Sequence, residues 1–183
     1  MICTTLNKIR EHHPCEDGWA KLLAGLGKTQ SDDEPLRFTD ILEINGLGDA
    51  LWATRSVPEY DKDWRLFSVW CARQVVTYTD DWRVVNALNV VERYSHGTAT
   101  EEALISARNA ASDAARSGAD NASRVTGRAV FALLTYVYGS SAAYAMSYAC
   151  VDIVAARAAF AFLAKEGVPV ADALTKRFLE IVS

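Results

Sequence analysis

The stretch GLGDALWATRSVPEYDKDWRLFSVWCARQVV, residues 46–76, decides the fold class of this chain. In its second half, residues recur at spacings of three and four, which is typical of an amphipathic helix with one buried face. The residues on that face are Trp64, Phe67, Trp70, Cys71, Gln74 and Val75. Pro58 suits a first helical turn, where its missing N–H needs no partner. The stretch therefore predicts a short helix over residues 48–57 and a longer one over residues 59–78. Charged residues off the apolar face are expected in solvent: Asp61, Lys62, Arg65 and Arg73.

Helical patterning continues on both sides of this stretch. The chain contains no run of alternating β-branched residues bounded by hairpin turns, so strands are not expected. Helix-capping residues and glycine or proline stops divide the rest of the chain into further helices over residues 5–12, 16–26, 40–44, 82–95, 101–119, 121–137, 140–165 and 170–182. Thr39 is the expected cap of the helix over residues 40–44, and residues 28–36 form a polar linker. We therefore predict an all-α, single-domain bundle of about nine or ten helices.

The two halves of the chain differ in composition. Residues 1–98 hold most of the aromatic side chains, whereas residues 99–183 are rich in alanine. An alanine has only a methyl group to bury, so its helices depend on close packing rather than on large side chains. A length of 183 residues fits one domain. We expect residues 1–183 to fold as a single helical domain with an aromatic part and an Ala-rich part.

The acidic residues are concentrated in one segment. The formal net charge of the chain is −4, but residues 32–81 alone carry eleven Asp and Glu against five Lys and Arg. A general nucleic-acid binder needs a basic stripe, so direct nucleic-acid binding is not expected. The acidic segment is interpreted either as a solvated face or as a surface that meets a basic partner, where charge steers encounter.

The cysteines and the apolar stretches predict a cytoplasmic location. Four cysteines, Cys3, Cys15, Cys71 and Cys150, lie far apart without a CxxC pair, which is typical of a reducing compartment. Residues 2–10 lack the pattern of a signal peptide. The apolar stretch over residues 142–164 contains charged residues near its middle, which are costly inside a bilayer. No membrane association is expected.

No constellation of residues predicts catalysis, a metal or a cofactor. His12, His13 and Cys15, with Cys3 upstream, form one cluster rather than the two close ligand pairs of a structural zinc site. The carboxylates of Asp61 and Asp63 are expected in solvent, whereas general acid–base catalysis by a carboxylate pair needs burial in a cleft. No GxSxG elbow surrounds any serine. We therefore expect a protein that is not an enzyme and needs no cofactor.

Two groups of residues are candidates for binding. Tyr60 and Trp82 lie beside acidic turns, and aromatic residues are enriched at binding hot spots. With their acidic neighbours they form the predicted partner surface: Tyr60, Asp61, Asp63, Asp80, Asp81 and Trp82. A second group lies on neighbouring helical segments with few acids, and a cationic pocket for a phosphorylated nucleotide signal is the alternative hypothesis there. Its residues are Arg108, Arg116, Arg124 and Arg128.

Four segments carry a resemblance to a known family. They are PCEDGW (14–19), DDEPL (32–36), ILEINGLGDALWATR (41–55) and DWRLFSVWCARQV (63–75). Over roughly residues 14–116 the chain resembles the helical immunity-protein family of bacteria and phages. Departures from the pattern are Thr54 and the Ser56-Val57-Pro58 connection, both beside the acidic turn.

The resemblance implies binding of a protein rather than catalysis. It is compatible with an immunity protein that covers a basic or nucleic-acid-acting toxin or nuclease, and equally with a phage-encoded, anti-CRISPR-like inhibitor of a host nuclease complex. The helix faces that carry small residues could pack within one chain or between two chains, so the sequence leaves homo-oligomerisation open.

Overall fold

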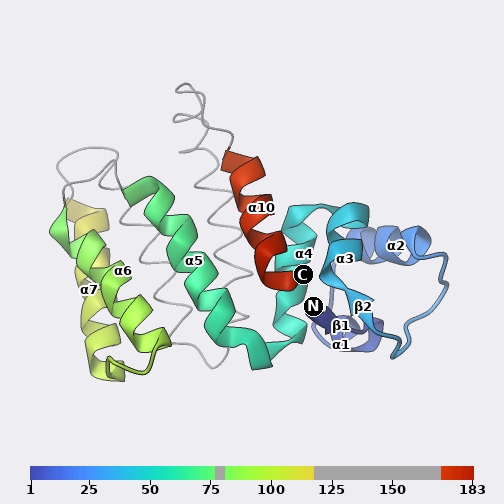
Figure 1. Ribbon diagram of the computed structural model, residues 1–183, viewed down its shortest axis with the longest axis horizontal. Helices are drawn as coiled ribbons and strands as arrows, with labels where there is room; N and C mark the ends of the chain where they lie inside the picture. The colour runs from blue at the N-terminus through green and yellow to red at the C-terminus, as the bar shows by residue number, and fades with distance from the viewer. Residues whose placement is uncertain (77–80, 118–169) are drawn as a thin grey trace.

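The computed structural model describes residues 1–76, 81–117 and 170–183. This part of the chain is mostly helical, which confirms the predicted all-α character (Figure 1). Its α-helices are α1 (Leu6–Arg10), α2 (Glu16–Gly25), α3 (Phe38–Asn45), α4 (Leu47–Ala53), α5 (Asp61–Val76), α6 (Trp82–Ser95), α7 (Glu101–Ser117) and α10 (Val170–Val182). Two 3-10 helices, η1 (Thr54–Ser56) and η2 (Pro58–Tyr60), join α4 to α5. The helices predicted over residues 121–137 and 140–165 lie outside the described residues.

Two short strands correct the expectation that the chain has none. β1 (Cys3–Thr4) pairs antiparallel with β2 (Leu36–Arg37), with Cys3 opposite Arg37 and Thr4 opposite Leu36. Thr4 and Leu36 are both buried, so the pairing ties the start of the chain to the segment before α3. Each strand has only two residues, which is too short to produce an alternating pattern in the sequence.

The helix starts and ends agree with the sequence signals at some positions and differ at others. α6 begins at residue 82, as predicted, and the side chain of Asp81 caps it by accepting a hydrogen bond from the backbone N–H of Arg83. Pro58 begins the separate 3-10 helix η2, whereas the sequence predicted it in the first turn of the long helix, which starts at Asp61 as α5. The expected cap at Thr39 is wrong, because Thr39 lies inside α3 and Arg37 precedes its first turn.

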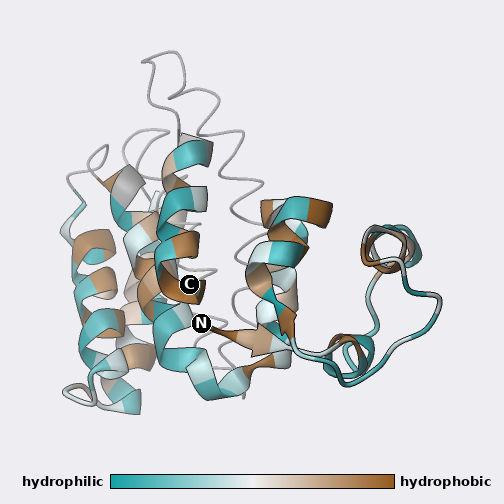
Figure 2. Cartoon of the chain, turned by 45° about the vertical axis from the view of Figure 1, so that its right-hand side comes forward, coloured by the Kyte–Doolittle hydropathy of each residue, from teal (hydrophilic) through white to brown (hydrophobic). Residues whose placement is uncertain are grey.

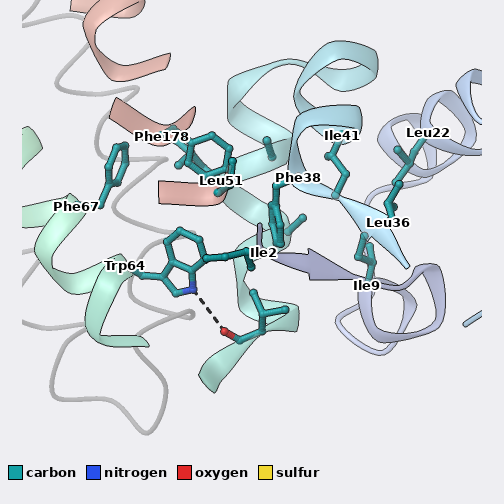
Figure 3. Close-up of a cluster of buried hydrophobic side chains, with 14 of the residues drawn as sticks. Ile2, Ile9, Leu22, Leu36, Phe38, Ile41, Leu51, Trp64, Phe67 and Phe178 are labelled. Atoms are coloured by element: carbon teal, nitrogen blue, oxygen red, sulfur yellow. Dashed lines mark hydrogen bonds between the residues drawn. The ribbon is translucent and has the colours of Figure 1, made fainter. Parts of the chain in front are cut away.

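An aromatic core joins the two ends of the chain (Figure 3). The ring of Phe178, from α10, lies 6.2 Å from that of Phe38, 6.3 Å from that of Trp64 and 6.1 Å from that of Phe67, measured between centroids. The backbone N–H of Ile2 donates to the carbonyl oxygen of Val182 at 2.8 Å. The C-terminal helix therefore packs within the aromatic part, although its sequence position places it in the Ala-rich half.

A second cluster lies between α5, α6 and α7, which run side by side in Figure 1. Small residues of α7, including Ala107, Ala111 and Ala114, pack against branched residues of α6, including Leu88 and Val91. In Figure 2 these helices carry both hydrophobic and hydrophilic residues, as amphipathic helices do. The described part of the Ala-rich sequence thus packs closely against α6, a helix with larger side chains.

Two arginines of α5 are less exposed than expected, because α6 covers that side of the helix. The guanidinium of Arg65 lies over the ring of Tyr94, 5.8 Å from its centroid. Arg73 donates to Asn89 Oδ1 at 2.9 Å and to Glu92 Oε2 at 2.5 Å. An arginine can bury its aliphatic stem and keep its polar head hydrogen-bonded, so a charged residue does not by itself mark a solvated face.

Candidate functional site

The predicted partner surface is divided between the two ends of α5. Tyr60, Asp61 and Asp63 lie at its start, whereas Asp81 and Trp82 begin α6 beside its other end. α5 has 16 residues, which corresponds to a length of about 24 Å at a rise of about 1.5 Å per residue. Asp80, the sixth predicted residue, lies outside the described residues. These residues were predicted to share one surface because their positions in the sequence are close. In the structure, the length of α5 separates them.

The residues at the start of α5 differ in exposure. Tyr60 is half-buried, and its ring lies 6.4 Å from that of Trp64, so it forms the edge of the aromatic core. Asp61 is also half-buried, which corrects the expectation that it lies in solvent, whereas Asp63 is exposed as expected. At this end of the predicted surface, Asp63 is therefore the acidic side chain that is most accessible to a partner.

Trp82 is strongly exposed at the other end. Its side chain is 68% exposed, and within the described part of the chain Met1 and Trp82 are the large hydrophobic residues with exposed side chains. Trp82 is the first residue of α6, directly after the capping Asp81. The sequence left open whether Trp82 is a core residue or an exposed anchor, and the structure exposes it.

Asp81 holds the start of α6 in place. Its carboxylate accepts hydrogen bonds from Arg83 at the backbone N–H (3.0 Å), Nε (2.9 Å) and Nη2 (2.6 Å). These bonds, led by the one from the Arg83 side chain, lower the pKa of Asp81 below its ordinary value. Arg83 also donates to Ser117 Oγ at 3.1 Å and so links α6 to the end of α7. The Asp81 side chain is only 13% exposed, so it supports Trp82 rather than presenting charge to a partner.

Part of the acidic surplus of residues 32–81 is neutralised by nearby cations. The Lys28 ammonium donates to Asp32 at 2.5 Å and to Glu34 at 2.6 Å, and the first of these bonds lowers the pKa of Asp32. The Arg37 guanidinium, one of the five cations already counted in this segment, donates to Asp40 and lowers its pKa. The acidic character of the surface therefore rests on fewer side chains than the sequence count implies.

The proposed anion pocket is only partly described. Arg108 is half-buried and Arg116 is exposed, while Arg124 and Arg128 lie outside the described residues. Arg116 donates to Asp113 Oδ1 at 2.6 Å and to Ser112 Oγ at 2.7 Å, both on its own helix. This i,i+3 pairing within α7 partly neutralises the charge of Arg116.

The histidine–cysteine cluster marks a turn between α1 and α2. His13 has a positive φ of 54°, and Cys15 precedes the first turn of α2. Burial, followed by the positive charge of Arg55, lowers the pKa of His12. Among residues 1–76, 81–117 and 170–183 there is no group of three or more His, Cys, Asp and Glu side chains that could hold a metal ion.

A pocket that the sequence did not indicate lies where α2, α3 and α4 meet. Its volume is about 280 Å³. The residues that line it are Ile9, Pro14, Cys15, Gly18, Trp19, Leu22, Ile41, Asn45, Asp49, Trp52 and Ala53. Figure 3 shows three of them, Ile9, Leu22 and Ile41, near one another at one end of the aromatic core. The lining residues come from two separate segments, so no local spacing could have signalled the pocket.

No helix in the described part of the chain is long and apolar enough to cross a membrane, and the apolar stretch over residues 142–164 falls outside that part.

Comparisons with known proteins assign no family to this chain. No family model, curated protein or solved structure matches this chain.

Proposed function

We propose that this protein is a non-enzymatic, immunity-type inhibitor that binds another protein and occludes its working surface. The observation that carries the proposal is the 68% exposure of Trp82. Leaving a large aromatic side chain in water forgoes the stabilisation of burial, about 25 cal/mol per Å² of apolar surface. Tryptophan is also among the residues most enriched at binding hot spots. Contact with a partner protein would bury the Trp82 side chain and so recover this stabilisation.

The surroundings of Trp82 support a contact role. The start of α6 is fixed by the Asp81 cap, and Arg83 connects it to Ser117 on α7. A side chain on a backbone that is already ordered loses less conformational entropy when it binds. Trp82 therefore combines a large apolar surface with a preorganised position.

The charge distribution supports a basic partner. Residues 32–81 carry an acidic surplus, and Asp63 is exposed at the start of α5. Acidic side chains accelerate encounter with a basic protein and disfavour acidic competitors. A toxin or nuclease that acts on nucleic acid presents such a basic surface. Bacterial immunity and phage anti-defence are two biological settings for the same inhibitory contact, and the neighbouring genes would distinguish them.

Affinity purification from the native host tests the proposal. Wild type would be compared with Trp82→Ala and with Lys21→Ala, which alters an exposed residue on α2. We expect wild type and Lys21→Ala to recover one protein in stoichiometric amount and Trp82→Ala to recover at least about tenfold less, because a hot-spot side chain contributes about 2 kcal/mol or more. Equal recovery by all three baits, or recovery of no protein, would contradict it.

A charge reversal tests the basic character of the partner. Asp63→Lys would be compared with Asp172→Lys, since both replace an exposed acid in the first turn of a helix and only Asp63 belongs to the acidic segment. We expect Asp63→Lys to slow association with the recovered protein and to reduce its salt dependence, whereas Asp172→Lys changes neither. The same salt dependence in both variants would exclude a basic partner at this surface.

A further inference from the structure

We propose that the partner protein receives the outer face of α6 in an uncharged groove, through Trp82, Asn86 and Asn89. This inference rests on the proposed function and adds to it the chemistry of the partner's binding site. The three residues are exposed and lie at spacings of four and three, so they share one face of α6. They form a line about 10 Å long, at a rise of about 1.5 Å per residue. This line is called the α6 stripe.

The α6 stripe carries no charge, although it faces solvent. Its three members are the exposed residues of α6 up to residue 92, and Arg93, the next exposed residue, ends the stripe. Exposed helix faces usually carry charged residues, whereas asparagine is a weaker helix former that favours caps and turns. Uncharged residues around an aromatic side chain are instead typical of the centre of a protein interface, where Lys, Asp and Glu are depleted. The stripe therefore fits a groove without charge.

Asn89 indicates which hydrogen-bonding group this groove presents. Its Oδ1 accepts a hydrogen bond from Arg73 Nη2, on α5, at 2.9 Å. A guanidinium only donates, so this contact determines the orientation of the amide and leaves Nδ2 as the donor. No acceptor in the described part of the chain takes a hydrogen bond from Nδ2. A partner that satisfies this donor presents an acceptor, and in an uncharged groove that acceptor is a carbonyl oxygen.

The course of α6 connects the stripe to both parts of the predicted partner surface. The guanidinium of Arg65, in the first half of α5, lies over the ring of Tyr94, near the end of α6. The two helices therefore run side by side in opposite directions (Figure 1). From Trp82, the stripe extends toward the end of α5 that carries Asp63. Uncharged contacts at the centre and charge toward the edge are the usual arrangement of an interface, and the charge at the edge steers a basic partner.

Replacing asparagine by aspartate on the stripe tests the inference. Asn86→Asp and Asn89→Asp keep the shape of the side chain but exchange its donor for a negative charge. Asn109→Asp makes the same change at an exposed residue of α7 and serves as the control. Calorimetric titration would measure affinity for the protein recovered with wild type. We expect both stripe variants to bind at least about tenfold more weakly, because a charged acceptor would face the carbonyl oxygen of an uncharged groove, and Asn109→Asp to bind as wild type does.

The other outcomes overturn the inference. Tighter binding by the two stripe variants would show that a basic surface covers the stripe, and unchanged binding would place the stripe outside the contact. If the wild-type chain dimerises in analytical ultracentrifugation and Asn89→Asp is monomeric, the stripe belongs to a second copy of this chain. Circular dichroism would verify that the variants fold, and either stripe variant alone is sufficient for the comparison.

Trp82→Ala distinguishes failure of the inference from failure of the proposed function. Where Trp82→Ala loses the partner but the stripe variants bind as tightly as wild type or more tightly, the inference is wrong and the proposed function stands. Where Trp82→Ala keeps the partner, or wild type recovers no protein, the proposed function is wrong and the inference falls with it.

Discussion

At the scale of single residues, Gly46 shows how one position directs the chain between two helices. It joins α3 to α4 with φ of 91° and ψ of 175°, a conformation that is essentially restricted to glycine. Its N–H donates to the Leu42 carbonyl oxygen at 2.9 Å and closes the last turn of α3. The sequence predicts a helix that ends at residue 44, and α3 ends one residue later, at Asn45.

Replacing Gly46 by alanine should therefore destabilise the fold. We expect Gly46→Ala to lower the free energy of unfolding by roughly 1–3 kcal/mol, because a Cβ atom is strained at this φ and ψ. Urea denaturation would measure the change. Gly48→Ala, two residues away, lies inside α4 and should be neutral or slightly stabilising. Equal stability of the two variants would contradict the strain account.

His12 predicts a dependence of stability on pH. Burial, and then the charge of Arg55, lower the pKa of His12 from its ordinary value of 6.5. Between the lowered pKa and 6.5 the unfolded chain binds more protons than the folded chain, so stability rises with pH across this window and is fully present above it.

Substitution of the two neighbouring histidines would separate this effect from other titrations. We expect His12→Gln to reduce the gain in unfolding free energy between about pH 5 and pH 8, whereas His13→Asn keeps most of it, since the charge of His13 is the smallest influence on the pKa of His12 and asparagine tolerates the positive φ. Urea denaturation at the two pH values measures the gain. An unchanged gain in His12→Gln would mean that the folded chain does not depress the pKa of this histidine.

At the scale of helices and strands, the spacing of apolar residues was sufficient to locate an element where that element is long and amphipathic. The spacing of Trp64 and Phe67 located α5, and that of Val84 and Leu88 located α6. It was insufficient for β1 and β2, whose two residues each contain no period. The spacing of residues also could not predict the pocket between α2, α3 and α4, because that pocket is formed by the packing of α2 against α3 and α4. The separation of Asp63 from Trp82 likewise depends on the length of α5 and not on their distance in the sequence.

The contact between α2 and α3 predicts an unusual response to a helix-favouring substitution. A Cβ atom at Gly25 would lie 2.5 Å from Ile44 Cγ2. Gly25→Ala should therefore lower stability by about 1–3 kcal/mol, because overpacking outweighs the gain of up to about 1 kcal/mol in helix propensity. A double-mutant cycle measured by thermal denaturation checks the cause. If Ile44→Ala in the same chain did not recover a large part of the loss, the close approach would not be its origin.

At the scale of the whole molecule, α10 closes the fold by bringing the C-terminal residues to the aromatic core. Phe178 contacts the rings of Phe38, Trp64 and Phe67, and Val182 accepts the backbone hydrogen bond from Ile2. Sequence composition could not reveal this arrangement, because it grouped α10 with the Ala-rich residues around it. These contacts join the two ends of the chain through one core, so we expect the two ends to unfold together.

Removing the Phe178 ring should therefore loosen both ends together. We expect Phe178→Ala to lower the free energy of unfolding by about 3–5 kcal/mol, the usual cost of deleting a buried aromatic ring. Hydrogen exchange at the Ile2 amide should accelerate in parallel, while Lys176→Ala, an exposed neighbour on α10, should change neither quantity. Protection of Ile2 that survives in Phe178→Ala would show that the ends are held independently.

The most direct test of the inhibitor proposal is photocrosslinking in the native host from position 82. The chain would carry p-benzoylphenylalanine in place of Trp82, and a second chain would carry it in place of Lys21 as the control. We expect one covalent product with a single basic protein from position 82, suppressed by excess wild-type chain and missing from position 21. No protein product from position 82, or the same products from both positions, would contradict the claim that Trp82 contacts a partner.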